Sequence, residues 1–270
     1  MSLIPPSFQG LALPGLRDAV VLITGATRGS GLMMAHLFAH CGAHVAINSR
    51  SHTETTQLAE VLHTRYHVPT LAVPGDVSNA ATVAQMFETI AVWSAQRLEV
   101  LICNAGHPLV HELWHTPLHE MKEEEVAQWF EQVRAVDLEG ARFCCRHALR
   151  LMLPQRRGSI VLISSTPALS GYRGTPYTEA KAALLGLMHD LAREYGAHNI
   201  RVNAVALGNI ASGWYESLST EQRNQLAHEA PLARWGQPEE VAGAILFLAS
   251  ELSGFVTGQT LVVDGGKVMR

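Results

Sequence analysis

The sequence predicts an α/β protein with one domain, built as a doubly wound parallel sheet with helices on both faces. Apolar runs rich in β-branched residues alternate with longer amphipathic stretches, which is typical of βαβ units. Several of these runs are continuous rather than alternating in hydrophobicity, as expected for strands covered by helices on both faces. Neither an internal repeat nor a linker interrupts the 270 residues, so one domain is the simplest account.

The expected elements follow one another along the chain. Strands are expected at 19–24, 44–48, 70–73, 100–103, 159–164, 201–205 and 260–263. Helices are expected at 31–40, 53–66, 80–95, 126–153, 177–195 and 238–250, and Pro238 suits the first position of the last one. We expect an N-terminal tail (1–17) before the domain (18–270). The segments 107–122 and 208–235 are expected to be irregular, and the second to form a small substrate lid.

Composition and charge narrow the class of protein. Hydrophobic residues make up 47% of the chain and charged residues 16%, which indicates much buried surface and favours a homo-oligomer. A net charge of -4 without a basic stripe argues against nucleic acid and against a membrane anchor. The first residues lack the basic region of a signal peptide, so we expect a cytoplasmic protein. Its four cysteines lie in apolar runs outside any CxxC pair, which predicts buried thiols: Cys41, Cys103, Cys144 and Cys145.

A glycine-rich turn, Thr24-Gly25-Ala26-Thr27-Arg28-Gly29-Ser30-Gly31, joins the first expected strand to the first helix. Glycines are needed where the strand turns tightly, where backbone approaches a diphosphate and where helix packs on strand. The helix N-terminus then offers free N–H groups and the positive end of its dipole to the phosphates. Glycines alone are weak evidence, but the strand before and the helix after complete the pattern of a Rossmann-type dinucleotide site.

The end of the second strand, Asn48-Ser49-Arg50, bears on the choice of cofactor. A carboxylate at this place would bind the ribose hydroxyls and favour NAD, and none is present. Arg50 and Arg28 instead fit the 2′-phosphate of NADP through charge-assisted hydrogen bonds. The alternative is that both arginines are solvated surface side chains. We therefore expect NADP(H) as the preferred cofactor, with NAD(H) left open.

Two more loops are expected at the carboxyl ends of strands, where open α/β sheets bind their ligands. Asp76 and Val77 follow the third strand, and Asn104, Ala105 and Gly106 follow the fourth. Asp76 can accept a hydrogen bond from an adenine amino group, or alternatively cap the helix that begins nearby.

Tyr177 and Lys181 are spaced i, i+4, so on a helix they share one face. A phenol with a pKa near 10 is a poor acid–base catalyst at neutral pH. A nearby ammonium stabilises the phenolate and moves that pKa toward the working range. The chain has three lysines among its many arginines, so lysine at 181 is a notable choice. Alone, a YxxxK spacing is usually a surface pair; here it follows a strand ending in Ser164-Ser165, downstream of the glycine turn.

From Asp18 to Gly266 the chain resembles the short-chain dehydrogenase/reductase family, especially its branch of β-ketoacyl-carrier-protein reductases. The matching segments are TGATRGSG (24–31), NAG (104–106), SIVLISS (159–165), YTEAK (177–181), RVNAVALGNIAS (201–212), PLARWGQPEEVAGAILFLAS (231–250) and TGQTLVVDGG (257–266). The resemblance implies an NADP-dependent oxidoreductase that interconverts a carbonyl and a secondary alcohol by hydride transfer, assembled as a tetramer or dimer. The alternative is a non-catalytic NADP-binding regulator or scaffold of the same fold.

By this resemblance, Tyr177 is the general acid/base, Lys181 binds the nicotinamide ribose and tunes Tyr177, and Ser165 holds the substrate carbonyl. Strand alignment favours Ser165, whereas the usual distance to the tyrosine favours Ser164. Ile210 and Ser212 are expected to contact the nicotinamide carboxamide. The full set of expected cofactor residues is Gly25, Thr27, Arg28, Gly29, Ser30, Gly31, Ser49, Arg50, Asp76, Val77, Asn104, Ala105, Gly106, Tyr177, Lys181, Gly208, Ile210 and Ser212.

Three departures from the family pattern stand out. Asp137 occupies the place of an asparagine that helps to hold a proton path to the lysine, so relay duty at this position is a hypothesis. Leu207 replaces a proline before Gly208, which loosens that turn. The segment between Gly106 and Trp129 is longer than usual and is expected to line the substrate mouth.

The segment His111-Glu112-Leu113-Trp114-His115 matches HExxH, a zinc-protease pattern that needs a helix to bring both imidazoles to one metal. Pro108 and Pro117 flank it and leave little room for a helix, so we expect a polar loop near the cofactor and no catalytic metal. In the expected lid, Trp214 and Tyr215 are candidate apolar substrate contacts, or else they pack the lid down.

Overall fold

The computed structural model describes residue 5 and residues 8–108, 110–171 and 173–269. Within these residues seven strands form one parallel sheet in the order β3-β2-β1-β4-β5-β6-β7. The order reverses between β1 and β4, and in open α/β sheets a ligand crevice lies at that point, beyond the carboxyl ends of the strands. The strands are β1 (Val20–Ile23), β2 (His44–Ile47), β3 (Thr70–Ala72), β4 (Val100–Cys103), β5 (Gly158–Ser165), β6 (Ile200–Leu207) and β7 (Thr260–Val263).

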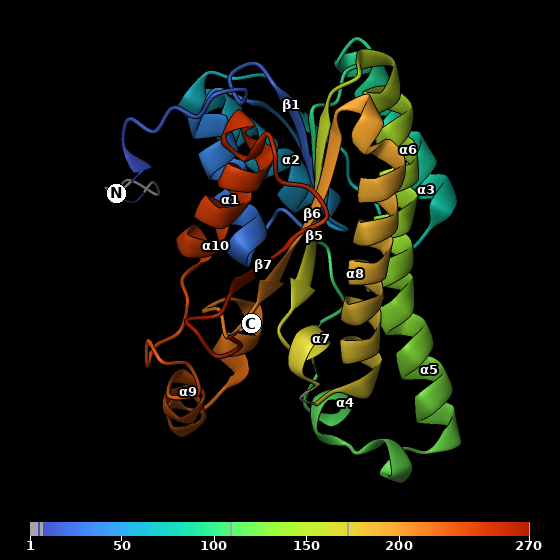
Figure 1. Cartoon of the computed structure of the whole chain (residues 1–270), viewed down its shortest axis with the longest axis vertical. Helices are drawn as coiled ribbons and strands as arrows, with labels where there is room; N and C mark the ends of the chain where they lie inside the picture. The colour runs from blue at the N-terminus through green and yellow to red at the C-terminus, as the bar shows by residue number, and fades with distance from the viewer. Residues whose placement is uncertain (1–4, 6–7, 109, 172, 270) are drawn as a thin grey trace.

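Helices cover both faces of the sheet, as the continuous apolar strands predict (Figure 1). One layer contains α1 (Gly29–His40), α2 (His52–Tyr66) and α10 (Pro238–Ala249). The other contains α3 (Ala80–Trp93), α6 (Gly140–Gln155) and α8 (Thr175–Tyr195). β1, β4 and β5 lie in the middle and all their residues are buried. The predicted α/β class and doubly wound parallel sheet are confirmed.

The predicted strand and helix boundaries agree with the structure to within about two residues, with one exception. The expected single helix at 126–153 is wrong: it is two helices, α5 (Glu123–Arg134) and α6, joined by a π-helical turn at Ala135–Glu139. Such turns widen the helix by one residue and recur at functional sites. Here the turn carries Asp137, a residue only 1% exposed.

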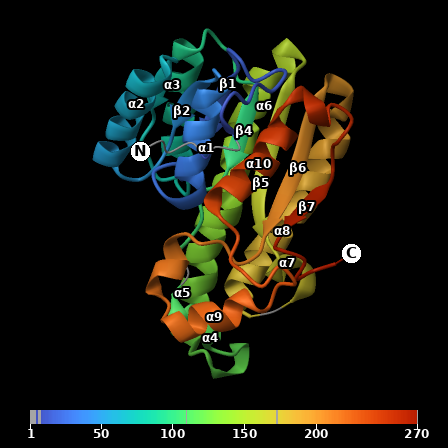
Figure 2. The ribbon, with the colours of Figure 1, turned by 90° about the vertical axis from the view of Figure 1, so that its left-hand side faces the viewer.

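Two segments expected to be irregular contain short helices, so that expectation is wrong in part. The first holds α4 (His111–His115) and a 3₁₀ turn at Leu118–Glu120, and the second holds a 3₁₀ turn at Gly213–Ser217 and α9 (Thr220–Ala227). Together with α5 and the short α7 (Pro167–Ser170) they gather at one end of the sheet (Figure 2). At α9 a side-chain cap explains a start that periodicity missed, since Ser219 and Gln222 form a reciprocal capping box.

The segment before Asp18 packs against the domain. Leu16 is fully buried in the core beside α1 and α10, and Phe8, Leu11 and Leu13 are packed against the same core. Burying these apolar side chains is favourable in free energy compared with leaving them in water. Prolines in the same segment keep its backbone irregular. Residues 1–4 and 6–7 of the expected tail lie outside the described residues.

The cysteines agree with a further expectation, since all four thiols are buried and free. Among the described helices, none has the length and apolar character needed to span a bilayer.

His36 makes the stability of the fold depend on pH. It is 3% exposed, its Nδ1 lies 3.0 Å from the Tyr66 hydroxyl, and burial lowers its pKa to about 4, helped by the nearby charge of Arg65. The unfolded chain binds this proton near pH 6.5 and the folded chain only near pH 4, so the free energy of unfolding falls across that window as the pH drops. We expect the Tm of His36→Gln, which stays neutral, to fall less than that of the wild type.

Thermal melts followed by circular dichroism between about pH 7 and pH 4 measure this difference. The control is His228→Gln on the exposed surface, which is expected to follow the wild type. Parallel losses of Tm in the wild type and in His36→Gln would show that another group is responsible.

Candidate active site

The glycine turn between β1 and α1 requires glycine for steric reasons. A Cβ on Gly31 would lie 2.1 Å from the carbonyl oxygen of Gly25, and a Cβ on Gly25 would lie 2.9 Å from the Cα of Ala105. Gly25 and Gly29 also have positive φ angles of 63° and 53°, which other residues rarely adopt. The turn is therefore packed tightly against the start of α1 and against the loop after β4.

Thr24 and Asn104 hold this turn across the switch point of the sheet. The Asn104 amide donates to the carbonyl oxygens of Thr24 and Gly25 at 3.1 and 2.9 Å, and the backbone N–H of Asn104 donates to the Thr24 hydroxyl at 3.0 Å. The side chain of Asn104 thus braces the turn, and the half-buried Ala105 adds a backbone N–H that donates to the Thr24 hydroxyl at 3.1 Å, whereas Gly106 is exposed.

The residues at this turn fit the diphosphate of a dinucleotide. Among the described residues, no side chain caps the first turn of α1. Its free N–H groups and the positive end of its dipole point to the crevice at the switch point. Thr27, Arg28 and Gly29 border the same turn, and Arg28 is exposed. A negatively charged group bound here would satisfy donors that the protein leaves open.

Of the residues expected to contact the adenosine, some are exposed and others are already hydrogen-bonded within the protein. Arg50 is exposed beyond β2, whereas the Ser49 hydroxyl is engaged within the protein, 2.7 Å from the Thr55 hydroxyl. Asp76 accepts from the backbone N–H and hydroxyl of Ser78 at 2.9 and 2.7 Å. Asp76 therefore shapes the turn after β3, and the helix cap it was thought to offer is supplied by Asn79.

Two neighbouring serines at the end of β5 face different partners. The Ser164 hydroxyl is 1% exposed and donates to the backbone carbonyl of Lys181 at 2.8 Å, which ties β5 to α8. The Ser165 hydroxyl donates to the carbonyl of Leu207 at 3.1 Å and is hydrogen-bonded to Tyr177. Ser165 is the serine beside the phenol, in agreement with the strand alignment.

Lys181 lies one helical turn beyond Tyr177 on α8 and is buried in an ion pair. Its Nζ is 2.7 Å from Oδ1 of Asp137 and donates to the carbonyl of Ile163 at 3.0 Å. It also lies 5.5 Å from the centre of the Tyr177 ring. The other carboxylate oxygen of Asp137 accepts from the backbone N–H of His107 at 2.7 Å.

Burial and charge act in opposite directions on these groups. Burial raises the pKa of Tyr177, the Lys181 ammonium lowers it, Asp137 raises it again, and the net pKa lies above the ordinary value of 10.0. Burial lowers the pKa of Lys181, but Asp137 and Tyr177 more than offset this, so its net pKa lies above 10.5. Lys181 is therefore a permanent cation and Tyr177 a phenol at neutral pH.

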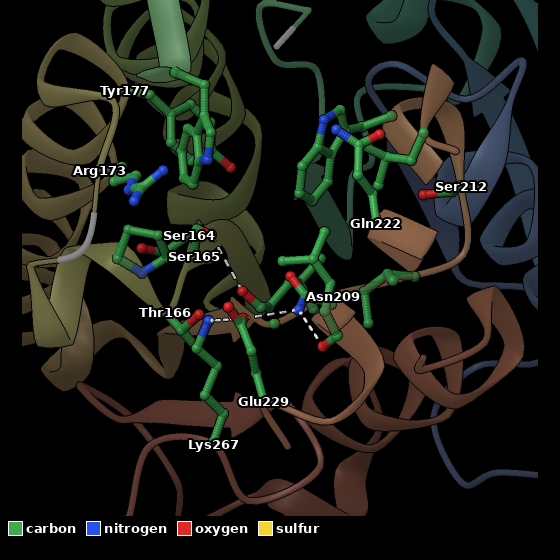
Figure 3. A pocket seen from close by; sticks show the side chains of 18 of the residues that line it. Ser164, Ser165, Thr166, Arg173, Tyr177, Asn209, Ser212, Gln222, Glu229 and Lys267 are labelled. Carbon is green, nitrogen blue, oxygen red and sulfur yellow. Dashed lines mark hydrogen bonds and ion pairs between the residues drawn. The ribbon is translucent and has the colours of Figure 1, made fainter. Parts of the chain in front are cut away.

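A cavity of about 330 Å³ opens beside Tyr177 and Ser165 (Figure 3). Ser30 of the glycine turn lies at its wall, and Gly208, Ile210 and Ser212 line the side formed by β6 and the lid. A Cβ on Gly29 would lie 2.9 Å from the Cβ of Ser212, so the lid begins directly against the glycine turn. The expected nicotinamide contacts and the catalytic candidates thus border one space.

Aromatic rings bridge the two sides of this cavity. Trp114 on α4 lies 5.9 Å from the Tyr177 ring and 6.2 Å from Trp214 of the lid, centre to centre. Trp214 in turn contacts Trp235, whose Nε1 donates to the carbonyl of Arg223 at 2.8 Å. Tyr215 also packs against Trp235 at 4.9 Å, so it packs the lid down, whereas Trp214 lines the cavity.

Charged groups mark two edges of the cavity. Arg173 lies 3.0 Å from the Nδ1 of His115, and Lys267 forms an ion pair of 2.5 Å with Glu229 (Figure 3). Sequence reasoning missed Arg173, Lys267 and Glu229, because none belongs to a motif. It also missed Glu54, whose carboxylate accepts from the Thr27 hydroxyl at 3.3 Å beside the glycine turn.

The HExxH segment does form a short helix, α4, so the expectation of a polar loop in the little room between the prolines is wrong. The five residues of α4 lie between Pro108 and Pro117, and Trp114 contacts the Tyr177 ring. The side chain of His111 lies outside the described residues. The part of the chain that the structure describes has no group of three or more His, Cys, Asp or Glu arranged to hold a metal.

A parallel sheet with a glycine turn at its switch point, and a tyrosine and lysine on one helix face, define a dinucleotide-dependent oxidoreductase. A family model described as enoyl-(acyl carrier protein) reductase matches residues 25–267. The chain belongs to the short-chain dehydrogenase/reductase family, whose members are NAD(P)-dependent oxidoreductases.

Relatives and solved structures agree on the branch. The chain is 36% identical over 261 residues to a 3-oxoacyl-(acyl-carrier-protein) reductase of Synechocystis sp., covering 95% of this chain and 100% of the relative. It is 34% identical over 249 residues to the Rickettsia felis reductase of the same name, covering 92% and 96%. A solved structure of a Brucella melitensis reductase of that name superposes with a TM-score of 0.88 at 32% identity, covering 100% of this chain and 98% of that one. A second Brucella melitensis structure, with bound NAD, has a TM-score of 0.86 at 32% identity and the same coverage.

Gly31 offers a test of the dinucleotide turn. In Gly31→Ala the added Cβ meets the Gly25 carbonyl at 2.1 Å, so the turn must open and its N–H groups lose their alignment. We expect the Kd for NADPH to rise at least about tenfold, measured by fluorescence titration. The control, Gly186→Ala on the exposed face of α8, meets no atom within 4 Å and is expected to bind NADPH as the wild type does. Unchanged binding by Gly31→Ala would contradict this site.

Proposed function

We propose that this protein reduces a carbonyl group to a secondary alcohol with NADPH, with Tyr177 as the proton donor. The observation that carries the proposal is the meeting of Tyr177 and Ser165 at one cavity that also borders the glycine turn, with the buried Lys181 ammonium 5.5 Å from the centre of the Tyr177 ring. Ser165 and Tyr177 carry neighbouring hydroxyl groups, and together they offer two donors to a single oxygen once the Ser165 hydroxyl turns from the Leu207 carbonyl toward the substrate. A carbonyl oxygen accepts two such bonds.

When bound, a reduced nicotinamide would supply the hydride for the new C–H bond on the carbonyl carbon. The electron pair of the broken C=O π bond goes to oxygen, and that oxygen takes the proton of Tyr177. Lys181 keeps a positive charge beside the phenolate that results, and Ser165 holds the oxygen in place throughout. In the reverse direction Tyr177 accepts the alcohol proton.

The substrate we propose is a 3-oxoacyl thioester, the class on which the named relatives act. The apolar walls of the cavity, formed in part by Trp114, Trp214 and Leu226, support an acyl chain. The description of the matching family model refers instead to an enoyl substrate, whose reduction adds hydrogen across a C=C bond. We favour the carbonyl because both named relatives are 3-oxoacyl reductases, and because the Tyr177 proton then goes directly to the oxygen of the bond that is reduced.

We propose Arg28 and Arg50 as the contacts that favour NADP(H), since both are exposed beside the glycine turn and neither carries a competing acidic neighbour in sequence. Glu54 is a negative charge near the same turn and works against a 2′-phosphate. The remaining expected cofactor residues are proposed contacts on the grounds of their position around the turn, the β4 loop and the lid.

We also propose a homo-oligomer. Large apolar side chains are exposed around α10 and β7, which supports burial of this face against another copy; they are Phe247, Leu252, Phe255 and Leu261. The cytoplasmic location expected from the sequence stays a prediction.

Replacing Tyr177 by phenylalanine tests the proposed proton donor. Tyr177→Phe keeps the ring that packs against Trp114 and removes only the hydroxyl. We expect NADPH affinity to be retained and kcat for a 3-oxoacyl thioester to fall by about 10²–10⁴-fold. Tyr195→Phe, at the far end of α8, is the control. The assay follows NADPH oxidation with a 3-oxoacyl thioester and the matching 2-enoyl thioester. Near-normal turnover by Tyr177→Phe, or preference for the enoyl compound, would overturn the proposal.

Cofactor preference is tested by removing the two arginines. Arg28→Ala and Arg50→Ala are each expected to raise KM for NADPH by about tenfold or more and to leave KM for NADH almost unchanged, because each removes one phosphate contact. Arg193→Ala, on the exposed end of α8, is the matched control. Equal changes for both cofactors would mean that the arginines do not bind the 2′-phosphate.

A further inference from the structure

We propose that Asp137 is a positioning residue that pins the Lys181 ammonium and offsets its charge beside Tyr177, so that the site is set to give a proton to a carbonyl rather than to take one from an alcohol. The inference rests on the proposed function and adds a working direction, reduction, to it. Four observations carry it: a buried pair of opposite charges, two donors aimed at one carboxylate, the position of Tyr177 next to that pair, and the neutral surroundings.

The carboxylate of Asp137 is held at both oxygens. Oδ1 lies 2.7 Å from Nζ of Lys181, and Oδ2 accepts from the backbone N–H of His107 at 2.7 Å. Side-chain exposure is 0% for Asp137 and 5% for Lys181, so water does not weaken the attraction. The π-helical turn at Ala135–Glu139 directs the carboxylate inward to this position.

Both partners of Asp137 are donors, and this requires a carboxylate. An asparagine has one oxygen and one NH₂ group, so it would turn a donor toward either Lys181 or His107. Gly106 makes room for the arrangement, because a Cβ at that position would lie 3.1 Å from Oδ1 of Asp137 and 3.7 Å from Nζ of Lys181. The three-residue loop Asn104–Gly106 thus leaves the space that the side chain at 137 occupies.

The pair limits what the ammonium does for Tyr177. Lys181 has three N–H donors, and the Ile163 carbonyl takes one of them, whereas Oδ1 of Asp137 forms an ion pair with the ammonium without hydrogen-bond geometry. The other N–H groups are available to a bound cofactor or to the phenol. Because the negative charge of Asp137 lies next to the positive charge of Lys181, the phenolate of Tyr177 meets a nearly neutral pair instead of a lone cation.

The other groups around this cluster add no charge that reverses the effect. Lys181 faces Cys103 on β4, whose thiol pKa is raised well above its usual value by a hydrogen bond with Cys145 and by burial, so it stays neutral. Ser164 and Ser165 approach from β5, and Leu113 of α4 and Val133 of α5 pack around Tyr177 and Ala180 as apolar side chains. His107 contributes its backbone N–H from the loop after β4, and its imidazole is the other titratable side chain on this loop, with an Nδ1 that is buried and has no hydrogen-bond partner in the described part of the chain.

Asp137→Asn tests the proposal through pH profiles. Loss of the negative charge stabilises the phenolate. The pH at which kcat for carbonyl reduction falls on the alkaline side is therefore expected to be lower by at least about one pH unit. The pH at which alcohol oxidation is lost on the acid side falls with it, so the rate of oxidation at about pH 7 rises relative to that of reduction. Asp190→Asn, an exposed residue on the same helix as Lys181, is expected to keep the wild-type profile.

If Asp137→Asn lowers kcat but leaves both sides of the pH profile where they are in the wild type, Asp137 only supports the fold and the proposal fails. Absence of carbonyl reduction by the wild type would instead remove the proposed function. The two failures are therefore distinguishable.

A second readout needs neither turnover nor cofactor. The absorbance of the Tyr177 phenolate is measured during a pH titration of the free protein, as the difference between wild type and Tyr177→Phe. In the wild type this absorbance is expected to stay absent up to about pH 9. In Asp137→Asn, compared with the double variant that also carries Tyr177→Phe, it is expected to appear at lower pH. Ionisation of wild-type Tyr177 near neutral pH would overturn the proposal even if Asp137→Asn does not fold.

Discussion

The buried ion pair between Lys181 and Asp137 constrains every other part of the candidate active site. Neither charge meets bulk water, and removing one partner of such a pair typically costs about 3–5 kcal/mol because the other is left buried alone. The pair therefore fixes α8 against the π-helical turn and the loop after β4. Tyr177 stands one helical turn before Lys181, and Ser164 joins the same helix to β5 through the Lys181 carbonyl. The phenol is placed by this framework and has little freedom of its own.

Most of the fold could be predicted from the sequence because its signals are local. The strands are short apolar runs covered on both sides, and glycines, prolines and caps mark where helices begin. The errors fell where tertiary packing decides the outcome. A helical pattern from 126 to 153 cannot reveal the π-helical turn at Ala135–Glu139, since the extra residue keeps the apolar side chains in contact with the core. The segment around Leu16 was assigned to a tail because its core partners lie far away in sequence, on α1 and α10.

The candidate site, too, could be predicted from the sequence only in part. The glycine turn and the Tyr177–Lys181 spacing are contiguous motifs, so the sequence alone predicts them. Asp137 was noticed as a departure, but its two donors became visible only in three dimensions. Trp114 was part of an HExxH match and proved to be the ring that contacts Tyr177 and bridges to Trp214. Arg173, Glu54 and the Glu229–Lys267 pair have no sequence signal, because each depends on elements that meet only after folding.

The order of strands in the sheet has a consequence for the synthesis of the chain. β1 pairs with β4, and the carboxylate of Glu99 accepts from the backbone N–H of Val20 at 2.7 Å, across 79 residues. Until β4 has left the ribosome, β1 has a partner on one side only and its other edge exposes unpaired N–H and C=O groups. Such long-range parallel pairing forms slowly and leaves partly folded chains open to aggregation. The switch point that creates the ligand crevice is therefore also the place where the nascent protein most depends on protection.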